Sequence, residues 1–411
     1  MSSEVNQNRL PSISCQLTVA DLLLSWFDLH ARDLPWRKSV PHPISSVFLN
    51  RLKEFIGDKV CRDRLTLRRD PYTVVVSELM LQQTQVSAVI PYYERFMECL
   101  PTVEVLALAD EMEVLKLWEG LGYYRRARSL SALAKHVVEN YKGMIPPNKK
   151  VLLSLPGIGP YTAGAILSFA YDLPEPAVDG NVVRIFSRLD AQPHVRGDVK
   201  ASRFVRDRVQ ELMPDERAGD FNESLMDVGA TICTPSSPAC AHCPLKSRCQ
   251  AYALDAVDQF PLRKDSEEKP IDQFSYVLLH RDDLVYVQRR QKGLLEGLFE
   301  FYSLAHHFGL EEEASICKSL HREFTVERCD SLLSENERVM SVHFVGERKA
   351  VYSHRMWEVS CWEVELISRS DMFLQIDAEA VGDWVTLEEL SELPFPTVLV
   401  PWRDAFVARH R

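Results

Sequence analysis

The residues best suited to metal chemistry form one short cluster. The chain holds ten cysteines, and four of them follow the spacing C-x6-C-x2-C-x5-C: Cys233, Cys240, Cys243 and Cys249. In a chain that shows no sign of secretion, such a cluster indicates metal binding rather than disulfides. Four thiolates can hold either a [4Fe–4S] cluster or a tetrahedral zinc ion. Lys246 and Arg248 lie inside this loop, either as phosphate contacts or as solvated charges.

A second feature is the glycine-rich segment LPGIGPYTAGAILSFA at 155–170. Gly157 and Gly159 flank one apolar residue, and Pro160 stands where a helix can begin without losing a hydrogen bond. Two helices joined by such a turn present backbone N–H groups that suit a phosphate oxygen. This kind of contact does not read a base sequence. A plain turn between two helices is the alternative.

Two carboxyl groups are candidates for acid–base work. Glu78 lies in the segment SELMLQQT on a largely apolar helix, where burial would raise its pKa and keep a proton available. Without other information, a glutamate on such a helix lies more often on its exposed face. Asp179 follows Tyr161 by eighteen residues and precedes a helix that starts near 182. It could cap that helix or face a cationic sugar.

Several motifs together resemble one known family. The hairpin, the Pro-rich segment and the aspartate are similar to the helix-hairpin-helix glycosylase superfamily, and within it to the adenine DNA glycosylase (MutY) family. The resemblance covers nearly all of residues 20–254. It is carried by DLPWR at 33–37, DPYTVVVSELMLQQTQV at 70–86, WEGLGYYRRAR at 118–128, LPGIGPYTAGA at 155–165, AVDGNVVR at 177–184 and FNESLMDVGA at 221–230.

The resemblance implies a reaction and roles for these residues. Glu78 would protonate N7 of adenine, and ionised Asp179 would stabilise the oxocarbenium ion that forms on the sugar, with Asn181 helping to position it. Tyr161 stands where bifunctional relatives of the endonuclease III type carry a lysine. Because a phenol cannot form a Schiff base with the sugar, we expect hydrolysis that leaves an abasic site.

The family also implies how the base is reached. Adenine must leave the stack before Glu78 can touch it, so base flipping into a pocket is expected. By resemblance, Trp36, Arg37 and Glu223 line that pocket, while Gln83 and Tyr123 fill or wedge the duplex near the lesion. The cysteine spacing is similar to that of the glycosylase cluster, which favours [4Fe–4S] over zinc. The expected partner is double-stranded DNA with adenine opposite 8-oxoguanine or guanine.

The C-terminal part more loosely resembles the Nudix-like domain with which this family reads 8-oxoguanine. Its signals are RRQKGLLEGLFEF at 289–301, YSHRMW at 352–357 and WVTLEELSELPFP at 384–396. Tyr352, Ser353 and His354 match the turn that probes the oxidised base, although a strand-end turn without a ligand is equally compatible with them. The region EEEASICKSLHREF lacks the Glu-rich Mg²⁺ helix of Nudix hydrolases, so pyrophosphatase activity is not expected.

Periodicity divides the chain into two fold types. Apolar residues recur at three- and four-residue spacing from about 17 to 254. Helices are predicted at 21–30, 71–81, 86–99, within 103–140, and at 149–153, 161–171, 182–190, 202–213 and 222–232. From about residue 274 onward, apolar residues alternate with a period of two. Strands are predicted at 274–280, 284–289, 339–344, 349–352 and 357–366, and a helix at 310–324. We therefore predict an all-α domain at 17–258, a linker at 259–273 and an α+β domain at 274–408. An inserted loop is predicted between 38 and 70.

Bulk properties narrow the class further. The net charge is −11, but residues 1–260 carry 30 Lys and Arg against 31 Asp and Glu, whereas residues 261–411 carry 18 against 28. Net charge therefore neither supports nor excludes DNA. No apolar run approaches the roughly 20 residues of a membrane helix. A monomeric intracellular protein is expected, in the nucleus and also the mitochondrion of a eukaryote, or in the cytoplasm and nucleoid of a bacterium.

Two other functions remain open at this stage. An endonuclease III-like glycosylase/lyase for oxidised pyrimidines is disfavoured by Tyr161 and by the second domain. A non-catalytic DNA-binding protein is disfavoured because both carboxylates are present. Replication or repair partners are not indicated by the sequence.

Overall fold

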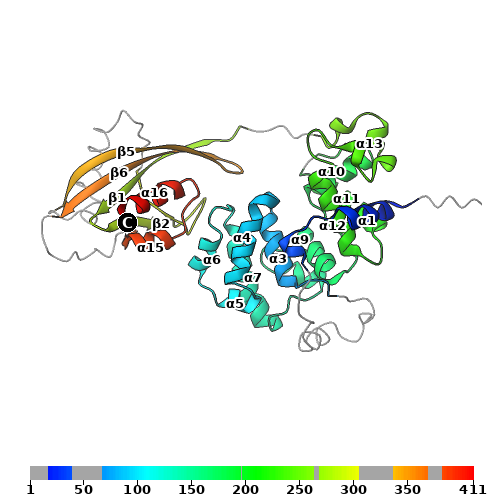
Figure 1. Ribbon diagram of the computed structural model, residues 1–411, viewed down its shortest axis with the longest axis horizontal. Coiled ribbons are helices and arrows are strands. Elements are labelled where there is room, and N and C mark those ends of the chain that lie inside the picture. The colour runs from blue at the N-terminus through cyan, green and yellow to red at the C-terminus, as the bar shows by residue number, and fades with distance from the viewer. Residues whose placement is uncertain (1–16, 39–66, 196, 263–267, 305–336, 369–381) are drawn as a thin grey trace, which may run out of the picture. The chain divides into compact units, whose positions relative to one another are not determined.

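The computed structural model in Figure 1 describes residues 17–38, 67–195, 197–262, 268–304, 337–368 and 382–411. The chain forms two compact units, each built from two segments of sequence. The first unit holds Met1–Leu79 and His136–Asp265, and the second holds Met80–Lys135 and Ser266–Arg411. The domains predicted from the sequence, 17–258 and 274–408, are instead divided where helices give way to strands. These domain bounds stay a prediction.

The first unit is helical. Its elements are α1 (Val19–His30), η1 (Pro35–Arg37), most of α3 (Pro71–Leu81), the end of α7 (Arg125–Tyr141), α8 (Lys149–Leu152), α9 (Pro160–Ala165), η2 (Ile166–Ala170), α10 (Gly180–Leu189), α11 (Val199–Leu212), α12 (Ala218–Thr231), η3 (Cys240–His242), η4 (Lys246–Arg248), α13 (Gln250–Ala253) and η5 (Val257–Gln259). Figure 1 shows α1, α10, α11 and α12 gathered together. Their apolar faces form one core, which includes Leu23, Ile185, Val205, Phe221 and Val228.

Local signals explain where these helices begin. Thr18 caps α1 through a hydrogen bond from the backbone N–H of Asp21 at 3.1 Å, and the Asp21 carboxylate accepts the Thr18 N–H at 2.8 Å. This reciprocal capping starts the helix two residues before the predicted position. The bounds predicted for 71–81 and 86–99 are confirmed, and the predicted helices in 149–232 are each present within a few residues. The stretch 103–140 holds three helices, and the loop predicted at 38–70 falls largely outside the described residues.

The second unit joins helices to a sheet. Its helices are the end of α3, α4 (Val86–Cys99), α5 (Val103–Leu108), α6 (Glu111–Leu117), most of α7, α15 (Leu387–Glu392) and α16 (Val400–His410). Its strands are β1 (Ile271–Arg281), β2 (Leu284–Arg289), β3 (Phe299–Glu300), β4 (Tyr302–Leu304), β5 (Glu337–Val351), β6 (Met356–Ser368) and β7 (Gly382–Thr386). The central order is β3-β2-β1-β6-β5, with β4 paired to β1 and β7 paired to β2.

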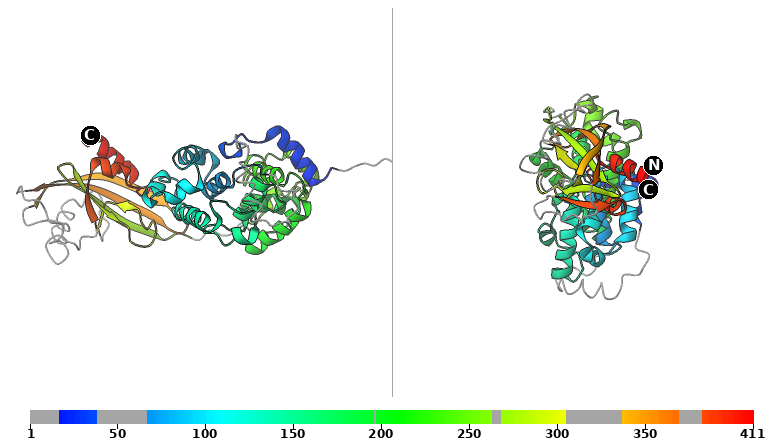
Figure 2. Two further views of the ribbon diagram at one scale, coloured as in Figure 1. Left: turned by 90° about the horizontal axis from the view of Figure 1, so that it is seen from below. Right: turned by 90° about the vertical axis from the view of Figure 1, so that its left-hand side faces the viewer.

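The sheet is mixed and buried on both faces. β1 and β6 run parallel, and the other pairs are antiparallel. Alternate residues of β1 enter different clusters: Tyr276 packs with Trp402 and Phe406 of α16, whereas Val277 packs with Trp362 on the opposite face. Figure 2 shows the twist of this sheet and its long β5–β6 hairpin. The turn 352–355 at one end of that hairpin is therefore anchored by a buried sheet.

The sequence-based strand predictions need one correction. Two strands, at 339–344 and 349–352, were expected where β5 runs unbroken from Glu337 to Val351. A register shift between Phe344 and Gly346 lets the strand continue through this polar stretch. The prediction for 284–289 is confirmed, whereas the helix expected at 310–324 lies outside the described residues. None of the described helices has the length and apolarity needed to cross a bilayer.

Candidate active site

Glu78 is a buried carboxyl on α3. Only 5% of its surface is exposed, and its helix neighbours Val75, Leu79 and Met80 are almost fully buried. Burial raises the pKa of Glu78 to about 7, and the charges of Asp179 and Glu223 raise it too, while a hydrogen bond from Tyr161 opposes the shift. Near neutral pH, this carboxyl therefore holds a proton for a large fraction of the time, as a general acid requires.

Tyr161 comes from the start of α9 and contacts Glu78 directly. Its hydroxyl donates to Oε2 of Glu78 at 2.6 Å. Burial raises the pKa of Tyr161 well above its usual value, and the carboxylates of Glu78 and Asp179 add to the shift. Tyr161 therefore remains protonated and fixes the orientation of the Glu78 carboxyl. It offers no amine with which to form a Schiff base.

Asp179 is the N-cap residue of α10. Its Oδ1 accepts the backbone N–H groups of Asn181 at 2.8 Å and Val182 at 2.9 Å, and its Oδ2 accepts the Asn181 side-chain amide at 2.7 Å. Burial raises the pKa of Asp179, while these hydrogen bonds and the charge of Arg184 counteract that rise. Asp179 therefore caps α10 and at the same time acts electrostatically on Glu78. Two carboxyl groups about one hundred residues apart in sequence interact electrostatically at one site.

Asn181 is held from two sides. Its Oδ1 accepts from Nη2 of Arg184 at 2.9 Å, and Arg184 also donates to the carbonyl oxygen of Cys233 at 2.7 Å. Helix α12 comes so close that a Cβ added at Gly229 would lie 2.8 Å from the Cβ of Asn181. The amide that supports Asp179 is thus fixed by α10, α12 and the start of the cysteine loop.

Two of the predicted pocket residues, Arg37 and Glu223, belong to a buried ion-pair cluster. Nη1 and Nη2 of Arg37 bind the carboxylate of Asp227 at 2.8 and 2.9 Å, and its Nε lies 2.9 Å from Oε1 of Glu223. Arg69 donates two hydrogen bonds to Glu223, at 2.7 and 2.8 Å. Trp36 is buried in η1, with 7% of its surface exposed. The sequence pattern did not identify Arg69 and Asp227, which complete this cluster.

We expect Arg69→Ala to lower the free energy of unfolding by about 1.5–3 kcal/mol, because it removes charge-assisted hydrogen bonds to the buried Glu223, which keeps Arg37 as a partner. Chemical denaturation measures this loss. The control is Arg208→Ala, which breaks an exposed pair with Glu211 at 2.9 Å and should cost no more than about 1 kcal/mol. Equal losses in the two variants would show that the Arg69 pair does not stabilise the fold.

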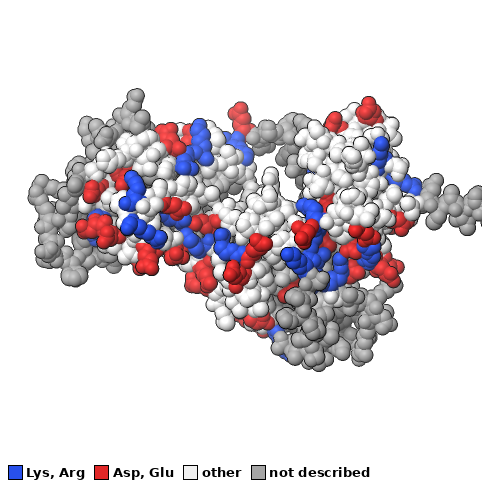
Figure 3. Space-filling model, in the orientation of Figure 1, with Lys and Arg blue, Asp and Glu red and all other residues white. Residues whose placement is uncertain are grey.

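The glycine hairpin has the predicted conformation. Gly157 has a φ of +77°, which favours glycine, and Gly159 is the N-cap of α9 with Pro160 as the first helical residue. A Cβ added at Gly159 would meet nothing within 4 Å, so a ligand can approach the backbone there. Lys and Arg side chains are interspersed with Asp and Glu on the surface in Figure 3. The hairpin therefore remains a candidate for phosphate contact through its backbone N–H groups.

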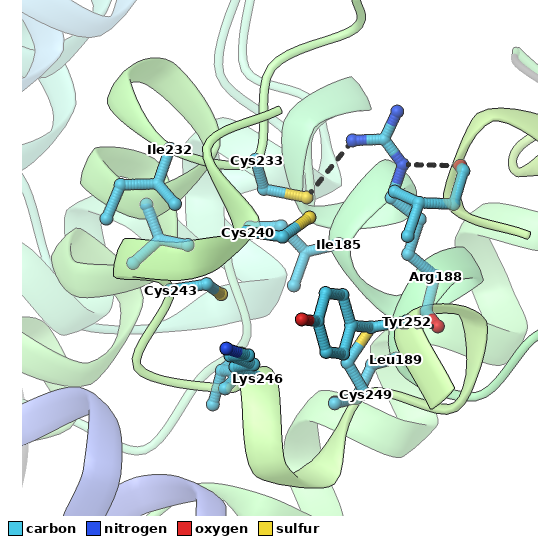
Figure 4. A pocket seen from close by; sticks show the side chains of 13 residues that line it. Ile185, Arg188, Leu189, Ile232, Cys233, Cys240, Cys243, Lys246, Cys249 and Tyr252 are labelled. Atoms are coloured by element: carbon cyan, nitrogen blue, oxygen red, sulfur yellow. Dashed lines mark hydrogen bonds between the residues drawn. The ribbon is translucent and has the colours of Figure 1, made fainter. Parts of the chain in front are cut away.

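The four clustered cysteines line one pocket, which Figure 4 shows together with Ile185, Leu189 and Arg188. None of them forms a disulfide. Nη1 of the buried Arg188 donates to Sγ of Cys233 at 3.3 Å. Burial raises the pKa of Cys243 to about 11. In the part of the chain that the structure describes, no three His, Cys, Asp or Glu side chains are arranged to hold a single metal ion.

The two basic residues predicted to contact phosphate from this loop, Lys246 and Arg248, are exposed. Lys246 lies 5.1 Å from the centre of the Tyr252 ring, and Arg248 donates to the backbone oxygen of Leu17 at 2.8 Å. Arg248 therefore attaches the C-terminal part of the loop to the residue that precedes Thr18, the N-cap of α1.

In the second unit, Gln83 and Tyr123 lie on two adjacent turns. Both are exposed and both have a positive φ, 58° and 50°. Arg126 joins these turns by donating to the carbonyl oxygens of Gln82 at 2.6 Å and Gly122 at 3.0 Å. The side chains predicted to wedge a duplex are thus presented outward on a rigid frame.

The turn predicted to recognise 8-oxoguanine, at 352–354, contacts Tyr123. The ring of Tyr352 packs against Trp357 with centroids 5.1 Å apart, while Ser353 and His354 are exposed. Oγ of Ser353 donates to the hydroxyl oxygen of Tyr123 at 3.1 Å. Tyr352 therefore supports the turn, and the two polar residues form its outer face.

The fold and the site together define a class of protein. Residues 76–211 match the HhH-GPD superfamily, described as base excision DNA repair proteins. The chain is 30% identical over 317 residues to the adenine DNA glycosylase of Buchnera aphidicola subsp. Acyrthosiphon pisum, covering 77% of this chain and 81% of that protein. It belongs to the adenine DNA glycosylase family.

Mammalian relatives are longer. The chain is 38% identical over 328 residues to the adenine DNA glycosylase of Rattus norvegicus, covering 69% of this chain and 59% of the rat protein. It is 42% identical over 230 residues to that of Homo sapiens, covering 56% of this chain and 38% of the human protein. The chain thus spans about half the length of these relatives.

Proposed function

We propose that this protein is a monofunctional DNA glycosylase of base excision repair. It hydrolyses the N-glycosidic bond of adenine paired with 8-oxoguanine or guanine, after the adenine has been flipped out of the duplex. Glu78 donates a proton to the leaving base, and ionised Asp179 stabilises the oxocarbenium ion on the sugar. The relatives' name, adenine DNA glycosylase, supports the choice of base.

The observation that carries this proposal is the pair of carboxyl groups with different environments. Glu78 is almost fully buried, has a pKa of about 7 and receives a hydrogen bond from Tyr161. Asp179 accepts three hydrogen bonds, each of which favours its charged form. Two carboxyl groups of different protonation state are what glycosidic bond cleavage uses. Hydrolysis rather than strand cleavage follows, because Tyr161 cannot form a Schiff base.

DNA would be bound by residues of each unit. The hairpin at Gly157 and Gly159 would bind a phosphate, and Gln83 and Tyr123 would fill the space left by the flipped base. In a Nudix-like C-terminal domain, Ser353 and His354 would read 8-oxoguanine. The 3.1 Å contact between Ser353 and Tyr123 supports this arrangement, because it joins a residue proposed to read 8-oxoguanine to a residue proposed to wedge the duplex.

The cysteine loop would hold a [4Fe–4S] cluster. Four cysteines line one pocket, and their C-x6-C-x2-C-x5-C spacing is similar to that of the glycosylase cluster. A cluster of several irons accepts four cysteine ligands spread around a larger volume. When bound, it would tie the loop to α10 and α12, since Ile185, Leu189 and Val228 line the same pocket.

This assignment predicts iron and acid-labile sulfide in the purified protein. Cys243→Ser should lose most of both, together with visible absorbance, because one of four ligands is removed. The matched control is Cys99→Ser, which changes an exposed free cysteine outside the loop and should leave the iron content unchanged. Stoichiometric zinc without iron in the wild-type protein would contradict the assignment.

Base release from a panel of duplexes tests the proposed activity. Adenine is placed opposite 8-oxoguanine, guanine or thymine, and each product is analysed with and without alkali. We expect release of adenine opposite 8-oxoguanine and guanine, with strand breaks only after alkali. Breaks without alkali, together with activity on oxidised pyrimidines, would favour a bifunctional lyase instead.

A further inference from the structure

The segment that carries Tyr123 is fastened to the C-terminal part of the second unit by a buried ion pair. The guanidinium of Arg403 in α16 donates from Nη1 to Oε1 of Glu119 at 2.7 Å and from Nη2 to Oε2 at 2.9 Å. The Arg403 side chain is only 4% exposed and that of Glu119 only 12%. The backbone N–H of Phe395 adds a third bond to Oε1 of Glu119, at 2.7 Å. Such bidentate charge-assisted bonds fix an orientation as well as a distance.

Neighbouring contacts hold both ends of the same segment. Nζ of Lys116 donates to the carbonyl oxygen of Ser391 at 2.6 Å, and the hydroxyl of Tyr124 donates to that of Phe395 at 3.2 Å. Burial alone would raise the pKa of Glu119, but its bonds with Arg403 hold that pKa below the usual value, so Glu119 stays ionised. Three positions in 116–124, namely Lys116, Glu119 and Tyr124, are therefore attached to residues 391–403.

The turn itself is conformationally unusual. Arg126 holds it on the helical side, and the bonds of Glu119 with Arg403 hold it to the C-terminal part of the unit. Gly120, Gly122 and Tyr123 have φ values of +101°, +71° and +50°. At its tip, Tyr123 is 43% exposed and accepts the hydrogen bond from Ser353. One solvent-exposed hydrogen bond is too weak to order two turns, since its net contribution is about 0.5–1.5 kcal/mol. The buried Glu119–Arg403 pair is the stronger constraint.

We propose that the Glu119–Arg403 pair is a positioning device for specificity, which holds the Ser353 and His354 turn beside Tyr123. Its loss would relax the preference for 8-oxoguanine over guanine opposite adenine more than it would slow adenine release itself. The inference rests on the proposed function, because it assigns a selectivity to the same site. Glu119 and Arg403 touch neither DNA nor the reacting atoms in this account, so they act through Tyr123 and Ser353.

The test compares adenine release from 8-oxoguanine:adenine and guanine:adenine duplexes in the full-length protein and in Glu119→Ala, Arg403→Ala and the double variant. We expect each single variant to lower the ratio of the two rates about tenfold, which corresponds to about 1.4 kcal/mol. The double variant should lower it little further, because both substitutions break one interaction. Partial misfolding would slow release from both duplexes equally and leave the ratio of the rates unchanged. A lowered ratio therefore cannot come from misfolding.

The matched control is Arg409→Ala on the same helix, which removes an exposed partner of Glu363 and should keep the wild-type ratio. Hydrogen exchange gives a second readout that does not depend on activity. Exchange in 120–124 and 352–355 should rise in Glu119→Ala and not in Arg409→Ala. Unchanged exchange in these turns, or an unchanged ratio in an active Glu119→Ala, would overturn the positioning role. Absence of adenine release by the wild type would instead refute the proposed function.

Discussion

Glu78→Gln should slow adenine release from an 8-oxoguanine:adenine duplex by about 10²–10⁴-fold, the usual contribution of a positioned general acid. Glutamine keeps the size of the side chain and can still accept the hydrogen bond that Tyr161 donates at 2.6 Å. It has no acidic proton for the leaving base. The loss should therefore appear in the single-turnover rate, whereas the affinity for the duplex should change little.

The control for this prediction lies on the same helix. Ser77 is also buried, and its hydroxyl donates to the carbonyl oxygen of Val74 at 2.9 Å. Ser77→Ala changes the packing of α3 without touching the acid, so its rate should stay within tenfold of wild type. If Glu78→Gln also stayed within that range, another group would have to protonate the base.

Asp179→Asn should slow the same reaction by about 10²–10³-fold, the usual effect of removing one stabiliser of transition-state charge. Asparagine caps helices about as well as aspartate does, so α10 should remain folded. Only the negative charge is lost. Because the charge of Asp179 helps to raise the pKa of Glu78, the substitution should also move the pH profile of the remaining activity towards lower pH.

Asp198→Asn is the matched control for that variant. Asp198 caps α11 by accepting the backbone N–H of Lys200 at 2.8 Å, and it does not belong to the described site. The same chemical change there should leave the rate unaffected. Equal rates for Asp179→Asn and wild type would mean that Asp179 serves only as a helix cap.

The sequence predicts the helices around the site better than the contacts between them. The apolar neighbours of Glu78 indicate burial, and the segment before α10 indicates an aspartate cap, because both signals are local. The contact of Glu78 with Tyr161 spans 83 positions, and that of Arg69 with Glu223 spans 154. Pairing over such separations depends on which helix faces pack together. Periodicity identifies the apolar face of each helix but not the helix that it packs against.

The C-terminal part shows the same limit. The strand predicted at 284–289 is correct because its run of strand-forming residues, LVYV, is continuous, whereas β5 was divided in two at a polar stretch where its register with β6 shifts. Helix α16 was not predicted, although its Arg403 holds Glu119 from 284 positions away. The contact between Ser353 and Tyr123 spans 230 positions and likewise has no local signal.

The pH dependence of adenine release most directly tests whether two carboxyl groups in different protonation states act together. Under single-turnover conditions with subsaturating enzyme, the rate reports groups of the free enzyme. Because Glu78 acts in its protonated form, the rate should be high below its pKa and fall as the pH rises through about 7. At lower pH it should fall again as Asp179 becomes protonated. A rate that stays constant from about pH 6 to pH 9, well on both sides of that pKa, would contradict the account.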